Sequence, residues 1–177
     1  MQTFDLRTTP TKPWVNGAGT RQELASGQQD GQTTWWLSAA NIERDCAFST
    51  YPGLARLHVV ISGSGTRLTG DGIDLEARPM TPIAFDGDTL LNCQLLGGPC
   101  TAFNVIYDPA MIHPDLSALE AGAHEVDARE IAVFCVSGSA SVDGMGLEVG
   151  QGALLRGAAT ITVDPSAEVL CARLDPA

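Results

Sequence analysis

Apolar residues recur along this chain in short runs that have the periodicity of β-strands. Between positions 56 and 61, Leu57, Val59 and Ile61 alternate with Arg56, His58 and Val60, and a period of two is typical of a strand with two different faces. Similar runs at 83–85, 90–96, 102–107, 131–136, 161–163 and 169–174 are separated by Gly, Asp and Pro turn signals. This pattern predicts an all-β protein of many short strands, arranged as a sandwich or a barrel.

One stretch has helical character instead. At 115–123, Asp115 or Ser117 could cap a short segment that is rich in Leu, Ala and Glu. We therefore expect little helix, confined to this stretch.

An internal repeat divides the chain. Residues 61–65 (ISGSG) match 136–140 (VSGSA), and residues 71–76 (DGIDLE) match 143–148 (DGMGLE) in the same order. Repetition of one supersecondary unit indicates a duplicated architecture. The repeat predicts an N-terminal barrel over 1–107, a linker over 108–127 and a C-terminal barrel over 128–177, packed as one compact unit.

Composition and net charge limit which binding partners and which cellular location we expect. The chain has 177 residues and a net charge of −11, which disfavours nucleic acid and anionic membranes because both are polyanions. The five cysteines are odd in number and form no C-x-x-C pair, so we expect reduced core thiols. No signal peptide is visible at the N-terminus, and the run at 131–136 is too short to span a bilayer. These features favour a cytoplasmic protein.

A protein-bound metal is not expected. The chain has only three histidines, and the residues two positions from His58 are Arg56 and Val60, which are not ligands. The repeat places Ile131 and Val133 at the equivalent positions of the second half, while His113 and His124 lie in the predicted linker without ligand spacing. No motif for a nucleotide or other cofactor is present either, so the sequence predicts no metal and no cofactor.

Several ordered motifs of the first half resemble one known family. They are the loop 13–19 (PWVNGAG), the segment 35–40 (WWLSAA), the turn 45–53 (DCAFSTYPG), and the segments 57–68, 85–88 and 103–105. Together they resemble the HutD/Ves family of the cupin superfamily. The resemblance implies two fused cupin-like β-barrels of the jelly-roll type without the usual metal ligands. It also implies binding of a metabolite of histidine utilisation, such as a urocanate- or formylglutamate-like carboxylate.

The sequence departs from the family pattern at polar positions. Three cationic positions become neutral, although Arg21 could substitute for one of them, while Glu23, Arg56 and Asn104 are kept. The changed positions are Val15 for the loop Lys, Gln22 for the Arg before the glutamate, Trp36 for the Arg of the W-R-L-S strand, and Ala55 and Ala102 for two Asp residues. A ligand that is less anionic than the family's, or different from it, is therefore expected.

Arg56 and His58 are the strongest candidates for a binding site. They lie two apart on a predicted strand and so share a face, and an arginine can hold a carboxylate through two parallel hydrogen bonds. The sequence leaves open whether this face points inward or toward solvent. If it points inward, the buried cation needs an acidic partner or a ligand.

Other candidates could surround this pair, each with a structural alternative. Trp14 and Trp36 could stack on a planar ligand or fill the core. Asn16 and Asn104 could read polar groups or stabilise turns, and Glu23 could act as a base.

The sequence favours non-covalent binding of a small polar or carboxylate metabolite over catalysis. Two alternatives remain at this point: a metal-free isomerase or hydrolase that uses His58 and Glu23, and a protein-interaction module with an exposed sheet edge or apolar patch. The oligomeric state is left open.

Overall fold

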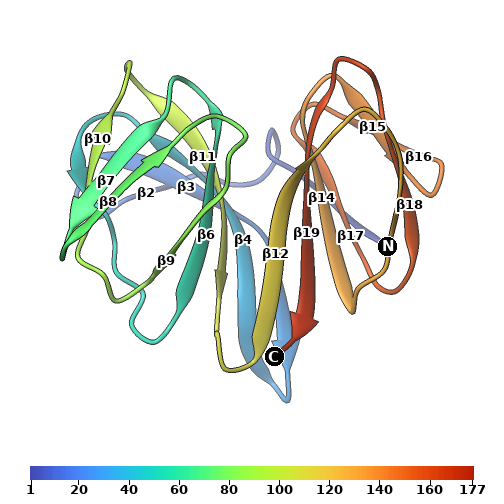
Figure 1. Ribbon diagram of the computed structural model, residues 1–177, viewed down its shortest axis with the longest axis horizontal. Helices are drawn as coiled ribbons and strands as arrows, with labels where there is room; N and C mark the ends of the chain where they lie inside the picture. The colour runs from blue at the N-terminus through green and yellow to red at the C-terminus, as the bar shows by residue number, and fades with distance from the viewer. The chain divides into compact units, whose positions relative to one another are not determined.

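The computed structural model describes every residue from Met1 to Ala177 and consists of strands joined by turns, with no helix (Figure 1). The prediction of an all-β chain is confirmed. Two compact units are present: an N-terminal unit, Pro10–Pro109, and a C-terminal unit that combines Met1–Thr9 with Ala110–Ala177. No segment forms a helix whose length and apolar character would let it cross a membrane.

The N-terminal unit contains two antiparallel sheets. Their strand orders are β2-β3-β4-β11-β6-β9 and β5-β10-β7-β8. The strands are β2 (Lys12–Pro13), β3 (Gly19–Gln29), β4 (Gln32–Ile42), β5 (Cys46–Ala47), β6 (Ala55–Ser62), β7 (Thr66–Gly70), β8 (Ile73–Ala77), β9 (Ile83–Asp86), β10 (Asn92–Leu95) and β11 (Cys100–Tyr107).

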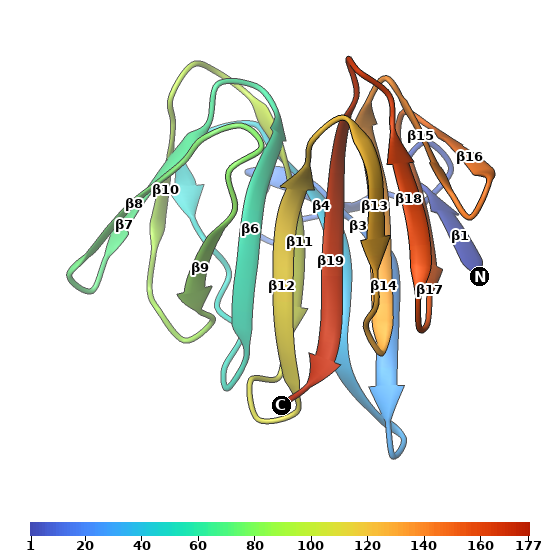
Figure 2. The same cartoon turned by 45° about the vertical axis from the view of Figure 1, so that its right-hand side comes forward.

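The C-terminal unit also contains two antiparallel sheets, ordered β1-β17-β14-β19-β12 and β13-β18-β15-β16. Figure 2 shows β12, β19 and β14 of the first sheet running side by side. The strands are β1 (Gln2–Asp5), β12 (Ile112–Leu119), β13 (Gly122–Val126), β14 (Glu130–Ser137), β15 (Ser139–Val142), β16 (Met145–Glu148), β17 (Gln151–Leu155), β18 (Ala159–Val163) and β19 (Glu168–Pro176).

Strand order repeats between the two units, in agreement with the internal repeat of the sequence. The order β9-β6-β11-β4 corresponds to β17-β14-β19-β12, and β5-β10-β7-β8 corresponds to β13-β18-β15-β16. Both D-G turns have the same backbone, with φ of 48° and 77° at Asp71-Gly72 and of 48° and 81° at Asp143-Gly144. Positive φ at both central residues is the geometry of a tight two-residue hairpin. In each unit the two sheets are separate hydrogen-bonded ladders and do not form one closed barrel.

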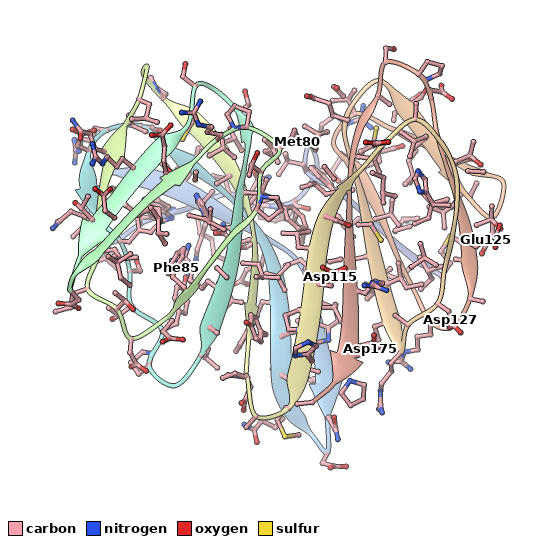
Figure 3. All side chains as sticks on the ribbon, in the orientation of Figure 1. Met80, Phe85, Asp115, Glu125, Asp127 and Asp175 are labelled. Atoms are coloured by element: carbon pink, nitrogen blue, oxygen red, sulfur yellow. The ribbon has the colours of Figure 1, made fainter.

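The expected helix at 115–123 is wrong. Asp115 lies in the middle of β12, which pairs with β19 along its whole length (Figure 3). Ile112 and Leu116 of β12 are buried, and Arg173 of β19 donates to Asp115 across the ladder, with 2.8 Å between Nη2 and Oδ2. Pairing with β19 therefore overrides a weak local helix preference.

The division of the chain also differs from the expected boundaries. The segment 108–127, expected as a linker, contributes the strands β12 and β13 to the C-terminal unit. The first residues belong to that unit as well, because β1 pairs with β17 over Gln2–Asp5. Nothing in the local sequence of 1–9 signals a partner about 150 residues away.

Each unit has its own apolar core, and the two cores differ in one respect. Ile131 and Val133 of β14 are completely buried in the C-terminal core, whereas the equivalent residues of β6 are Arg56 and His58. All five cysteines are free, as expected, and four of them are buried. The duplicated scaffold thus buries a cation and an imidazole in one of its two copies.

Candidate functional site

Two rows of side chains cross the large sheet of the N-terminal unit. Residues that stand opposite each other on antiparallel strands point to the same face. The first row is Glu23, Ser38, Asn104 and His58, and the second is Trp36, Ile106, Arg56 and Phe85. Strand pairing therefore brings five of the seven predicted site residues to one face: Glu23, Trp36, Arg56, His58 and Asn104.

Arg56 points into the interior of the unit. It is only 7% exposed, and its guanidinium carbon lies 5.1 Å from the ring centroids of Phe48 and Phe85 and 5.3 Å from that of Tyr51. Phe85 lies on β9, at the edge of this sheet (Figure 3). Burial lowers the pKa of Arg56 to about 10, so the side chain remains a cation at neutral pH.

The buried cation has few polar partners. Arg56 Nη2 donates to Asn104 Oδ1 at 2.9 Å, its Nε atom has no partner, and no ion pair involves this arginine. The surrounding rings supply cation–π attraction, which compensates only part of the lost hydration. An anion at this place would satisfy the remaining donors.

His58 is completely buried beside Arg56. Its Nδ1 atom lies 2.8 Å from the same Asn104 Oδ1. Because a carbonyl oxygen only accepts, this network assigns the proton to Nδ1 and leaves the lone pair of Nε2 without a partner. Burial, and then the charge of Arg56, lowers the pKa of His58 to about 4. The imidazole is therefore neutral near pH 7.

A small cavity lies against Arg56 and Asn104. It has a volume of about 40 Å³ and is also lined by Trp14, Arg21, Ser38, Ala40, Ser49, Tyr51 and Ile106. This volume suits a group of a few atoms. The charged residues of the lining are both arginines, and the other polar residues can donate hydrogen bonds. The cavity is therefore suited to a compact acceptor such as a carboxylate.

Two wider pockets share lining residues with this cavity. The Trp14 pocket, of about 360 Å³, is lined by Pro13, Trp14, Val15, Asn16, Arg21, Ala47, Phe48 and Ser49. The Trp36 pocket, of about 180 Å³, is lined by Arg21, Glu23, Trp36, Ser38, Tyr51, Leu54 and Ile106. Arg21 borders all three spaces.

Trp14 and Asn16 belong to the loop before β3 and serve partly structural roles. Trp14 packs edge-on against Phe48, with 6.4 Å between ring centroids. The Asn16 side chain accepts from the backbone N–H of Ala18 at 3.0 Å and donates to the carbonyl of Ala47 at 3.3 Å. Trp14 thus remains available as a wall of the cavity, whereas the Asn16 amide is committed to holding the loop.

Glu23 lies at the rim and not inside the unit. Its side chain is half exposed, 3.2 Å from Lys12 Nζ and 3.8 Å from Arg21 Nη2. Two strands, β4 and β11, separate it from β6, which carries His58. At the usual strand spacing the two backbones are roughly 14 Å apart, which is too far for a directly coupled acid–base pair.

Sequence reasoning missed four lining residues or gave them no clear role: Arg21, Ser38, Ser49 and Tyr51. Ser38 could have been found only from strand register, because it stands opposite Asn104 on the neighbouring strand. Ser49 and Tyr51 lie in the D-x-x-F-S-x-Y-P-G turn, whose aromatic residue could have suggested a contact with Arg56.

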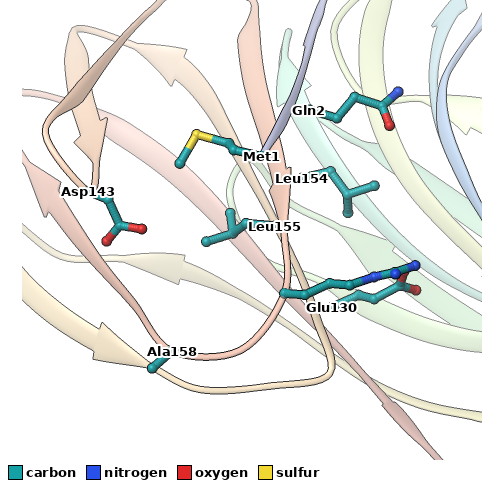
Figure 4. A pocket seen from close by; sticks show the side chains of 8 residues that line it. Met1, Gln2, Glu130, Asp143, Leu154, Leu155 and Ala158 are labelled. Carbon is teal, nitrogen blue, oxygen red and sulfur yellow. The ribbon is translucent and has the colours of Figure 1, made fainter.

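The C-terminal unit has a pocket of a different kind. It measures about 570 Å³ and is lined by Met1, Gln2, Glu130, Asp143, Leu154, Leu155, Arg156 and Ala158 (Figure 4). Its most buried charge is already paired, because Glu130 Oε1 accepts from Arg156 Nη2 at 2.8 Å. This pocket therefore lacks the unsatisfied buried cation that marks the N-terminal unit.

Across the chain, no three His, Cys, Asp or Glu side chains converge in a way that could hold a metal ion. The burial of Cys93 raises the pKa of its thiol to about 12, so it is a poor nucleophile near neutral pH. The chemistry of the site therefore centres on Arg56, His58 and Asn104.

Comparison with known proteins shows the family and the fold of the chain. A family model described as HutD matches residues 6–172. An uncharacterized 21.2 kDa protein in the hutC 3′ region of Pseudomonas putida is 33% identical over 155 residues, which is 84% of this chain and 80% of the relative. The solved structure of HutD from Pseudomonas fluorescens SBW25 has a TM-score of 0.88 at 28% identity and covers 99% of this chain and 98% of its own.

A more distant likeness concerns the fold alone. The bacterial pirin YhhW from Escherichia coli, a cupin-fold protein, has a TM-score of 0.70 at 11% identity, with 99% of each chain covered.

Proposed function

The chain belongs to the HutD family, and from that premise we propose that it binds a small carboxylate metabolite without chemical change. The carboxylate would lie in the cavity at Arg56. Such a protein acts as a sensor or buffer, and the family association supports a role in restraining histidine utilisation. We also propose that the two units are fused cupin-like folds of the jelly-roll type, each built from two separate sheets, and that they work without a bound metal or cofactor.

One observation carries the proposal: Arg56 is a buried cation with no acidic partner, next to a cavity. A buried charge is costly unless something compensates it, and the rings of Phe48, Tyr51 and Phe85 do so only in part. Asn104 uses its carbonyl oxygen to hold Arg56 and His58. Its amide nitrogen, which only donates, remains for an acceptor on the ligand.

Binding is better supported than catalysis. The alternative enzyme would use His58 and Glu23 together, yet the separation of their strands and the depressed pKa of His58 disfavour proton transfer between them at neutral pH. Of the other predicted residues, Trp14 and Trp36 keep binding roles as walls, whereas Asn16 holds the loop and Glu23 lies at the rim.

The proposal is tested by calorimetric titration with acetate, urocanate and N-formylglutamate, with acetamide as a neutral match for acetate. We expect the carboxylates to bind and to be recovered unchanged, and acetamide not to bind. Arg56→Met should abolish binding, whereas Arg67→Met should retain it, because Arg67 is an exposed residue that pairs with Asp74. Equal binding of acetamide, or full carboxylate affinity in Arg56→Met, would contradict the proposal.

A further inference from the structure

We propose that the Trp36 pocket receives the apolar tail of the ligand, so that this protein selects a monocarboxylate with an aromatic or similarly bulky hydrocarbon tail. The inference rests on the proposed function, because it takes the carboxylate to lie at Arg56. The cavity at Arg56 has room for the carboxylate and little more. Any larger ligand must extend into one of the two wider pockets.

The row across the sheet favours the Trp36 pocket as the path of the tail. Trp36 stands opposite Ile106 on the next strand, and Ile106 stands opposite Arg56. At the usual strand spacing, the backbones of Trp36 and Arg56 are about 10 Å apart. A short arylalkanoate anchored at Arg56 can therefore pass over Ile106 and place its ring beside Trp36.

The Trp36 pocket adjoins the Arg56 cavity, and the two share four lining residues: Arg21, Ser38, Tyr51 and Ile106. Its volume of about 180 Å³ is close to that of the ~150 Å³ cavity that binds benzene in another protein. Trp36, Leu54, Tyr51 and Ile106 give it walls of indole, phenol and aliphatic carbon, which favour stacking and burial of an apolar ring.

Charge at this pocket selects against a second carboxylate on the tail. The charged lining residues are Arg21 and Glu23, whose side chains lie 3.8 Å apart and compensate each other. Lys12 also contacts Glu23 at 3.2 Å. A second carboxylate would gain attraction from Arg21 but would lie close to Glu23, whereas a hydrocarbon tail meets no such conflict.

The Trp14 pocket is the competing path. It is wider, at about 360 Å³, and Val15 in its lining is fully exposed. An apolar tail in this larger pocket would remain more exposed to water than in the Trp36 pocket, and would therefore gain less from burial. The variants described below would show whether the tail binds in the Trp14 pocket instead.

The test compares 3-phenylpropanoate, glutarate, acetate and 3-phenylpropan-1-ol by isothermal titration calorimetry, with competition for the weaker ligands. We expect 3-phenylpropanoate to bind at least about tenfold more tightly than acetate or glutarate, which is the effect of burying a modest apolar area. The alcohol, which lacks the carboxylate, should not compete. Glutarate binding as tightly as 3-phenylpropanoate would overturn the inference.

Matched variants locate the tail. Trp36→Ala should weaken 3-phenylpropanoate about tenfold and leave acetate within about twofold, while Trp36→Phe should keep most of the affinity. Trp14→Ala should leave the ratio of the two affinities unchanged, because Trp14 borders the carboxylate cavity but not the Trp36 pocket. A ratio that falls in Trp14→Ala and not in Trp36→Ala would place the tail in the Trp14 pocket and refute the assignment.

If acetate binds through Arg56 but the tail preference is absent, only the tail assignment is wrong. If no carboxylate binds, and Arg56→Met behaves like the wild type, the proposed function fails and the tail assignment fails with it.

Discussion

Arg56 Nη2 donates a hydrogen bond of 2.9 Å to Asn104 Oδ1, across the ladder between β6 and β11. The acceptor is a neutral amide, so the arginine is oriented without being neutralised. Because His58 Nδ1 contacts the same oxygen at 2.8 Å, Asn104 fixes both side chains. The hydrogen bond between Arg56 and Asn104 explains how the buried cation can be held in place and still be available to an anion.

Asn104→Asp should therefore weaken the binding of a carboxylate at Arg56. The new carboxylate would lie within ion-pair distance of Arg56 and would take the place of the ligand's negative charge. We expect acetate affinity to fall more than about tenfold while the protein stays folded, since a close opposite charge is worth at least a few kcal/mol in a buried site. Calorimetric titration and thermal unfolding measure the two effects.

The matched control is Asn104→Ala, which removes the acceptor without adding a charge. This variant should lose about 1–3 kcal/mol of unfolding free energy, because it leaves buried donors unpaired. It should nevertheless keep more acetate affinity than Asn104→Asp. The reverse order of affinities would show that Asn104 does not act by leaving Arg56 charged and free.

Arg56→Met should abolish carboxylate binding without lowering the free energy of unfolding. Replacing a buried, unpaired cation by an apolar side chain of similar length removes a desolvation cost. We expect the free energy of unfolding in urea to be unchanged or to rise by up to about 2 kcal/mol, although carboxylate binding is lost. A loss of more than about 2 kcal/mol would mean that the aromatic contacts already satisfy Arg56.

Gly27→Ala tests the packing of the opposite face of the large sheet. Gly27 stands opposite Trp35, and a Cβ atom at position 27 would overlap the indole ring, which is completely buried. We expect a loss of about 1–3 kcal/mol in urea unfolding, the usual cost of overpacking. Gly146→Ala is the control, because its Cβ would meet no atom within 4 Å. Equal stability of the two variants would contradict the packing found at Trp35.

Local sequence patterns were sufficient to predict much of the fold. The D-G turns and the matched segments predicted the duplication, and the period of two placed Arg56 and His58 on one face. The same periodicity could not say which face is internal, because β6 is covered on both sides: Val59 is as completely buried as His58. A strand buried on both faces lacks the polar side that would orient it.

The contacts that make the site depend on register between distant strands. Asn104 meets His58 and Arg56 only because β11 pairs with β6, 46 to 48 residues away in the chain. Between Thr101 and Ala102 the register of this ladder shifts, and a shift of one residue would turn Asn104 to the other face. No local pattern encodes that shift, nor does one encode the pairing of β1 with β17.

His58 should make stability depend on pH. Its pKa is about 4 in the folded protein and 6.5 ordinarily, so the unfolded chain binds a proton that the folded chain excludes. The resulting stability is complete above pH 6.5 and is lost as the pH falls toward 4, by about 3 kcal/mol in all. Urea unfolding between pH 4 and 7 should show this slope in the wild type and in His113→Gln, a variant of an exposed histidine, but a reduced slope in His58→Gln. An unchanged slope in His58→Gln would show that His58 is not held neutral by burial.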